Sequence, residues 1–190
     1  MEALLSQEPM VRMGAFIGVF ALMALWEILA PRRQRQVRKG YRWLNNLGIV
    51  AVDAAVVRGA FPAAAVGVAL FVETQGWGIL RLIDMPYWLM IVVSVIVLDF
   101  AVWAQHVFFH AVPLLWRLHR MHHADLDFDV TTGLRFHPIE ILLSMFIKAG
   151  VIVMLGVPAV AVLLFEVLLN ATSMFNHGNV RLPHQLDRVL

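Results

Sequence analysis

Cysteine is absent from this 190-residue chain, and its absence removes several kinds of chemistry at once. Without thiols the protein has no disulfides, no iron–sulfur cluster and no zinc site built on thiolates. Any metal site must therefore use histidines or carboxylates. Charge is also scarce, because only 15% of the residues are Asp, Glu, Lys or Arg, whereas about 25% is usual in a soluble domain.

Several familiar motifs are missing as well. The chain has no Gly-rich nucleotide-binding fingerprint, and it lacks the His-Glu-x-x-His motif of a membrane zinc hydrolase. Its N-terminus has neither the early basic residues nor the cleavage site of a signal peptide. The first apolar stretch is therefore predicted to be a retained helix.

Apolar residues are abundant, at 61% of the chain, against about 45–50% in soluble domains. The third apolar segment alone would form a helix about 36 Å long, enough to cross a hydrocarbon core of about 30 Å. We expect an all-α integral membrane protein, a bundle of about four to five transmembrane or re-entrant helices. The predicted segments are Val11–Leu29, Leu47–Val72 with a kink near Pro62, Pro86–His110, and Pro138–Met174 divided at Gly156-Val157-Pro158.

A basic run separates the first two apolar segments. It contains six cations and no acid: Arg32, Arg33, Arg35, Arg38, Lys39 and Arg42. Such a run can bind nucleic acid, but its place between apolar segments favours a cytoplasmic loop of a membrane protein. If the second segment spans, the third helix and the later hairpin return the histidine-rich region 106–137 and His177 to the same cytoplasmic face.

Histidines are concentrated where the third helix leaves the membrane. Five of the eight lie within residues 106–123, as His106-x3-His110 and His119-x2-His122-His123. Spacings of three and four residues place side chains on one helical face, and imidazole is the commonest metal ligand. Five imidazoles without thiolates suit iron, zinc or copper, and more than four ligands suggest two ions.

Polar residues near this cluster are candidates for support. Asp99 shares a helical face with His106, and we expect it to accept a hydrogen bond from the far nitrogen of a ligand histidine. His137 and Glu140 flank Pro138, where either helix capping or support of the metal site explains them. In the loop between these features Asp125, Asp127 and Asp129 alternate, and a solvated loop face is the default interpretation.

A polar stripe follows the last apolar arm: Glu166, Asn170, Ser173 and His177 share one face. We predict His177 as a metal ligand. For Asn170 and Ser173 both support of that site and ordinary interhelical hydrogen bonding stay open. Lys148 lies as far before the predicted turn as Glu166 lies after it, so we expect these two charges to pair within the membrane.

Four motifs occur in order along the second half of the chain: Asp99-x6-His106-x3-His110, Trp116-Arg117-x-His119-x2-His122-His123, Arg135-Phe136-His137-Pro138-x-Glu140 and Phe175-Asn176-His177-x-Asn179. Together they resemble the sterol desaturase/fatty acid hydroxylase superfamily. Members are integral membrane enzymes with a histidine-bound di-metal centre, usually di-iron, that use O2 and external electrons to hydroxylate or desaturate lipid C–H bonds.

The resemblance implies metal roles for His106, His110, His119, His122 and His123 and supports His177. The predicted supporting residues are Asp99, His137, Glu140, Asn170 and Asn179, with no catalytic residue beyond the metal centre.

The resemblance also predicts two domains. Residues 1–95 are expected to form N-terminal membrane helices with the basic cytoplasmic loop, and residues 96–190 a fatty acid hydroxylase-like histidine-box domain. The family has a further His-x-x-His-His box after the position of His177, where this chain has only His184 before Leu190. We therefore expect a C-terminally truncated member of the family that binds metal weakly.

The predicted function is O2-dependent oxidation of a lipid or sterol-like C–H bond at two non-haem iron ions. Its partners would be the bilayer, the lipid and a separate reductase or a ferredoxin- or cytochrome-type electron donor, with no nucleic acid. The alternatives are a non-catalytic membrane protein that binds a metal or haem, or a degenerate family member. Haem needs axial ligands on facing helices and a transporter needs ligands near mid-membrane, whereas these histidines gather at one face.

Overall fold

The computed structural model describes residues 5–188, and within them all regular structure is helical. The predicted all-α fold is therefore confirmed. The helices are α2 (Glu8–Leu29), α3 (Lys39–Ala60), α4 (Ala64–Gln75), α5 (Tyr87–Ala111), α6 (Pro113–His123), α7 (Pro138–Leu155) and α8 (Ala159–Asn176), with short 3₁₀ turns η1 (Ile79–Leu82) and η2 (Thr132–Leu134).

Five segments of the described chain are long and apolar enough to cross a membrane, with α3 and α4 counted as one kinked segment. Most of their apolar side chains face outward, which suits contact with lipid. The prediction of four to five membrane helices is confirmed by these lengths and compositions.

Proline and glycine divide the helices where the sequence indicates. Pro62 follows the end of α3, and Gly156 closes α7 in the left-handed region at φ 74°. The predicted start of the second segment at Leu47 is wrong, because α3 begins at Lys39. Its first turns contain Arg42 and Asn46, which are buried against polar partners.

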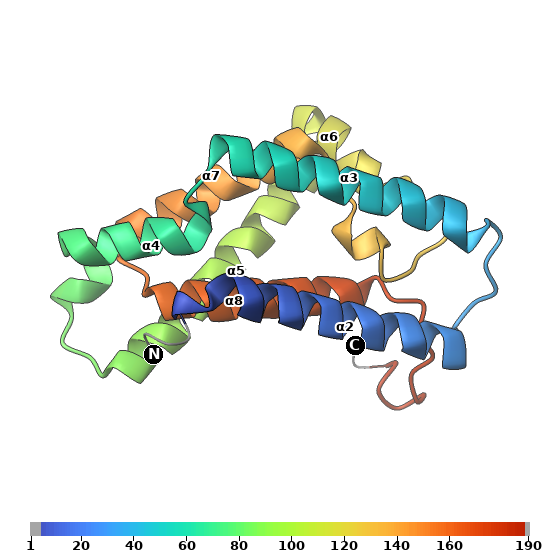
Figure 1. The fold of residues 1–190 in the computed structure, drawn as a ribbon, viewed down its shortest axis with the longest axis horizontal. Helices are drawn as coiled ribbons and strands as arrows, with labels where there is room; N and C mark the ends of the chain where they lie inside the picture. The colour runs from blue at the N-terminus through green and yellow to red at the C-terminus, as the bar shows by residue number, and fades with distance from the viewer. Residues whose placement is uncertain (1–4, 189–190) are drawn as a thin grey trace.

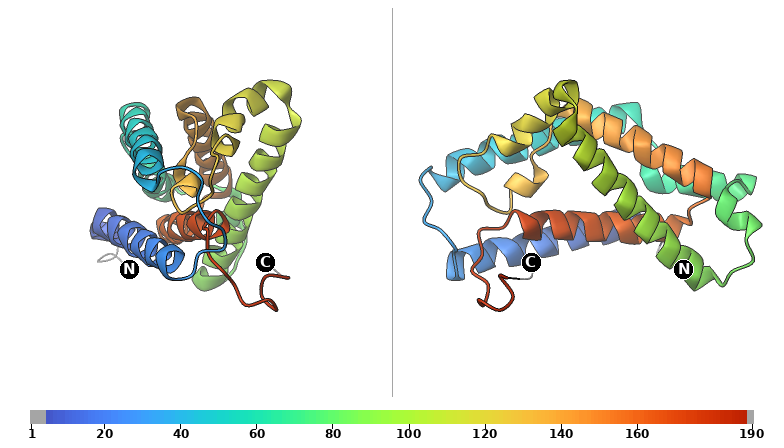
Figure 2. Two further views of the ribbon diagram at one scale, coloured as in Figure 1. Left: turned by 90° about the vertical axis from the view of Figure 1, so that its right-hand side faces the viewer. Right: turned by 180° about the vertical axis from the view of Figure 1, so that it is seen from behind.

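The helices form two layers (Figures 1 and 2). One layer contains α3, α4 and α7, the other contains α2 and α8, and α5 crosses beside both. Helix α8 is the most buried of the candidate spans and packs against α2, α4 and α5. A central helix of this kind connects the layers and carries its C-terminal end to the histidine-rich region.

The basic loop lies beside the segment that follows α8. Pro31 and Val180 form an isolated antiparallel bridge, and Arg181 N donates to Ala30 O at 2.8 Å. The basic loop therefore lies at the same end of the molecule as His177, the arrangement that the predicted topology requires.

Candidate metal centre

Four imidazoles from two successive helices converge on one point. His106 and His110 lie on the last turns of α5, and His119 and His123 lie on α6. Extended Val112 separates the two helices and Pro113 begins α6, so the second pair folds back against the first. One ligand atom of each of the four lies within 4.8 Å of those of the others.

The spacing of these nitrogens fits a shared metal ion. His110 Nε2 lies 3.1 Å from His106 Nε2, and His123 Nε2 lies 3.2 Å from the Nε2 atoms of both His110 and His119. Metal–imidazole bonds of about 2.0–2.1 Å place neighbouring ligand nitrogens about 2.9–3.4 Å apart. The donor set is therefore suited to one ion among the four rings.

A second pair of imidazoles adjoins this group. His122 Nε2 lies 2.9 Å from His177 Nε2, although the two residues come from α6 and the end of α8. The ring centroid of His122 is 5.0 Å from that of His123, and its other side stacks on Phe136 at 4.6 Å. The six histidines predicted as ligands thus gather in one region, divided into a group of four and a pair.

Hydrogen bonds to the far ring nitrogens leave Nε2 available for a metal. His119 Nδ1 lies 2.7 Å from Glu140 Oε1, and His122 Nδ1 lies 3.1 Å from the carbonyl oxygen of Arg135. His177 Nδ1 lies 2.7 Å from the carbonyl oxygen of Ser173. Because these carbonyl and carboxylate oxygens accept, they favour the tautomer with the proton on Nδ1 and the lone pair on Nε2.

The environment also keeps His122, His123 and His177 neutral. Burial, and next the neighbouring His177, lowers the pKa of His122 to about 3. Burial likewise lowers the pKa of His123 and of His177, and His119 adds to both effects. A neutral imidazole is the form that binds a metal, so these three rings are in the metal-binding form at pH 7.

A buried charge network holds the loop that follows α6. Arg42 of α3 donates to Asp125 at 2.8 and 2.6 Å and to Asp129 at 2.7 Å, and Asn46 donates to Asp125 at 3.1 Å. Burial alone would raise the pKa of Asp125, but hydrogen bonds from Arg42, Thr132 and Asn46 lower it to about 2. The interpretation as a solvated loop face is wrong for Asp125 and Asp129, since both are buried. In the sequence, the burial of these two carboxylates was indicated only by Arg42 and Asn46, two possible partners one helical turn apart.

Glu27 of α2 is a residue that the sequence analysis missed. Its side chain is only 1% exposed and accepts hydrogen bonds from the backbone N–H groups of Val130 at 2.7 Å and Asn179 at 2.9 Å. Arg35 donates to the same carboxylate at 2.9 Å. One carboxylate thereby joins α2, the loop at Val130 and the segment after His177. In the sequence, this role was indicated by an isolated acidic residue in an apolar helix.

Four of the predicted supporting residues lie away from the histidines of the centre. Within residues 5–188, none of Asp99, His137, Asn170 and Asn179 hydrogen-bonds to a histidine. Asp99 is exposed about two helical turns before His106. His137 caps α7 by accepting from Ile139 N at 3.2 Å, and Asn179 bonds both backbone groups of Arg33 at 2.9 and 2.8 Å. Only Glu140 among the predicted supporters contacts a histidine of the group.

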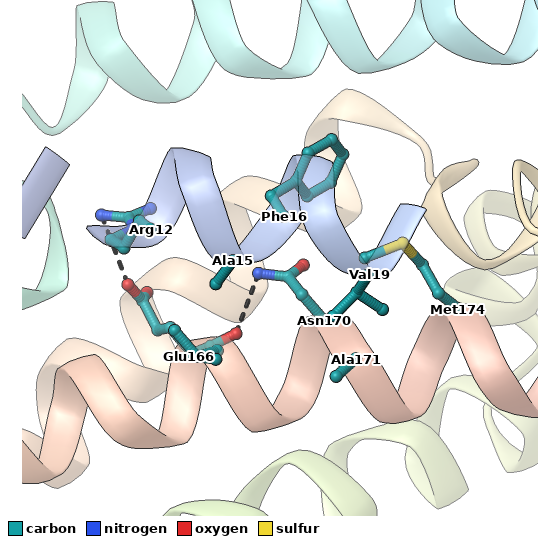
Figure 3. A pocket seen from close by; sticks show the side chains of 9 residues that line it. Arg12, Ala15, Phe16, Val19, Glu166, Asn170, Ala171 and Met174 are labelled. Atoms are coloured by element: carbon teal, nitrogen blue, oxygen red, sulfur yellow. Dashed lines mark hydrogen bonds and ion pairs between the residues drawn. The ribbon is translucent and has the colours of Figure 1, made fainter. Parts of the chain in front are cut away.

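The polar residues along α8 make contacts in two separate regions of the structure. Near its start Glu166 contacts Lys148 at 3.1 Å, which confirms the predicted pair, and Arg12 of α2 at 3.4 Å. Figure 3 shows Arg12 and Glu166 facing each other across the α2–α8 contact, and Asn170 Nδ2 donating to the carbonyl oxygen of Glu166 at 2.9 Å. Near its end Ser173 donates to Gly133 O at 2.7 Å beside the centre. Asn170 is therefore a helix-packing residue, separate from the centre.

Comparison with known proteins assigns the chain to a family. Neither the curated proteins nor the solved structures include a match to this chain. Residues 91–190, just over half of its length, match the fatty acid hydroxylase family. That region contains all six converging imidazoles together with Glu140. The chain belongs to the fatty acid hydroxylase family.

Proposed function

We propose that this protein is a membrane oxidoreductase that hydroxylates or desaturates a lipid or sterol-like C–H bond, using O2 and two histidine-bound non-haem iron ions. The observation that carries the proposal is the convergence of four imidazole nitrogens beside a second pair, at the end of membrane-length helices. Family membership supports the same class of chemistry.

The chemistry needs a group that side chains cannot supply. Unactivated C–H bonds require a strong oxidant, and iron that activates O2 supplies one. The residues of the chain would hold this centre in place. Glu140 and the carbonyl oxygens of Arg135 and Ser173 keep the proton on Nδ1 and fix the ring orientation. Phe109 and Phe136 pack against His119 and His122 and exclude water from one side of the centre.

Access to the centre suits a substrate that stays in the bilayer. His106, His110 and His123 are exposed, whereas His119 is fully buried. Exposed ligands at the end of α5 would be reached by a lipid that lies along that helix. Electrons would come from a separate reductase or a ferredoxin- or cytochrome-type donor, because the sequence contains no Gly-rich nucleotide fingerprint.

The proposal is tested by metal content and oxygen incorporation. The chain would be produced in membranes under 18O2, its metals measured by plasma mass spectrometry, and 18O sought in extracted lipids. We expect iron in the purified chain and an 18O-labelled lipid, or a desaturated lipid and labelled water. His119→Ala should lose both, whereas His184→Ala, exposed and outside the cluster, should retain both. Bound zinc alone with unchanged lipids would contradict the proposal.

A further inference from the structure

A crevice opens between α5 and α8 on the lipid-facing side of the bundle. Its volume is about 290 Å³. Phe165 is buried at its base, and Ile96 and Leu168 are exposed at its edge, at 61% and 52%. The lining residues are Val95, Ile96 and Asp99 of α5 with Phe165, Leu168, Leu169 and Thr172 of α8.

The lining is apolar at one end and polar at the other. On each helix the polar residue, Asp99 or Thr172, is the lining residue closest in sequence to the histidines that follow, His106 on α5 and His177 after α8. Asp99 is also the middle residue of the 25-residue α5. Its carboxyl group therefore lies at the depth of the hydrocarbon core, where an acidic side chain is energetically costly and usually has a function.

Both polar groups offer oxygen lone pairs to a ligand. The Thr172 hydroxyl donates its one hydrogen to the carbonyl oxygens of its own helix, Leu168 at 2.9 Å and Leu169 at 3.1 Å, so lone pairs are what it presents. The Asp99 carboxylate has no hydrogen bond or ion pair to any residue in the range 5–188. An unpaired acceptor in an apolar setting is stabilised by a ligand that donates.

We propose that this crevice binds a lipid bearing a hydroxyl or amino group, with that group at Asp99 and Thr172 and the hydrocarbon chain over Phe165 and Leu168. A lipid that ends in a carboxylate is disfavoured, because an ionised carboxylate has no hydrogen to donate to Asp99 or Thr172. The identification of this lipid as the substrate rests on the proposed function, whereas its binding to the crevice does not. Asp99 and His106 share a helical face about 10 Å apart along the axis, so the oxidised carbon would lie about that far from the donor group.

The test is a binding experiment on the full, metal-free chain in lipid nanodiscs. The probes are mid-chain diazirine analogues of hexadecanol, hexadecylamine and palmitate, crosslinked by light and located by peptide mapping. We expect the alcohol and the amine to label the segments 95–99 and 165–172 about tenfold more than palmitate does, the discrimination expected from one hydrogen bond. Unlabelled hexadecanol should compete.

Variants separate the role of the carboxylate from general contact with lipid. Asp99→Asn should bring the ratio of alcohol to palmitate labelling close to one, and Asp99→Lys should reverse it. Phe100→Ala changes an adjacent lipid-facing residue outside the crevice and should leave the ratio unchanged. If Asp99→Lys does not fold, Asp99→Asn still tests the proposal, because it replaces the carboxyl group by an amide with almost no change of shape.

Equal labelling by all three probes, labelling spread evenly over the lipid-facing helices, or a preference that survives Asp99→Asn would each overturn the proposal. Because no metal or turnover is involved, failure here leaves the iron and 18O results untouched. A chain without iron could in turn still show the predicted preference among the probes.

Discussion

Arg42 illustrates how a single residue stabilises the histidine loop from outside the segment that matches the family. It is 5% exposed and pairs with Asp125 and Asp129, and both of these carboxylates are also buried. Removing one member of a buried ion network leaves charges without compensation, which costs far more than the network gains over apolar packing. The effect of a substitution here is therefore expected to be large.

Replacing Arg42 with Met should lower the free energy of unfolding by about 3–5 kcal/mol, because two buried carboxylates lose their partner. Thermal unfolding of the chain in detergent measures the change. Arg38→Met alters an exposed cation of the same basic run and should change stability by less than about 0.5 kcal/mol. Equal losses of stability in the two variants would show that the buried network stabilises the protein no more than an exposed cation does.

At the scale of elements, a close backbone contact fixes the turn between α7 and α8. A Cβ added to Gly78, which precedes η1, would lie 2.1 Å from the backbone nitrogen of Gly156. Gly78 also has φ 115° and Gly156 φ 74°, conformations that residues with side chains rarely adopt. The connector after α4 is therefore pressed against the turn that sets the direction of α8.

Gly78→Ala should destabilise the protein by more than about 2 kcal/mol, since it combines a steric clash with a strained backbone. Gly150→Ala provides the matched control, because Gly150 lies inside α7 with open space around it. That change should be neutral or stabilise by up to about 1 kcal/mol through helix propensity. Melting temperatures of both variants test the expectation, and a tolerated Gly78→Ala would argue against the close contact.

At the scale of the whole molecule, the histidines join parts of the chain that are far apart in sequence. His122 of α6 meets His177 at the end of α8, 55 residues later, and Glu27 of α2 ties the loop at Val130 to Asn179. Burial of neutral imidazoles at this junction makes the stability of the metal-free fold depend on pH.

The metal-free chain should lose stability as pH falls from about 6.5 toward 3. His122 has a pKa near 6.5 when unfolded and about 3 when folded, so over this range the unfolded chain binds the proton and the folded chain does not. Unfolding measured in a chelator at successive pH values should show this slope. His122→Gln should make the slope shallower, because His123 and His177 still contribute to it, and His184→Gln should leave it unchanged. Asp125 adds a separate loss only below pH 3.8, down to its folded pKa of about 2.

Sequence alone predicted the membrane-length helices and their breaks, except for the start of α3, and it singled out the six histidines. Apolar length, proline and glycine act locally, and histidine spacing on one helix is set by its geometry. The Lys148–Glu166 pair was also predictable, because the turn between their helices fixed their relative depth.

Only the tertiary structure decided the partners of the buried carboxylates. Arg42 meets Asp125 across 83 residues and Glu27 meets Asn179 across 152, so no local pattern specifies either contact. The division of the histidines into a group of four and a pair depends on how α6 folds back on α5 and where α8 ends. Asp99 shared a helical face with His106, yet its surroundings are a lipid-facing crevice. Helical periodicity predicts the direction in which a side chain points, but only the packing of the helices determines which groups it contacts.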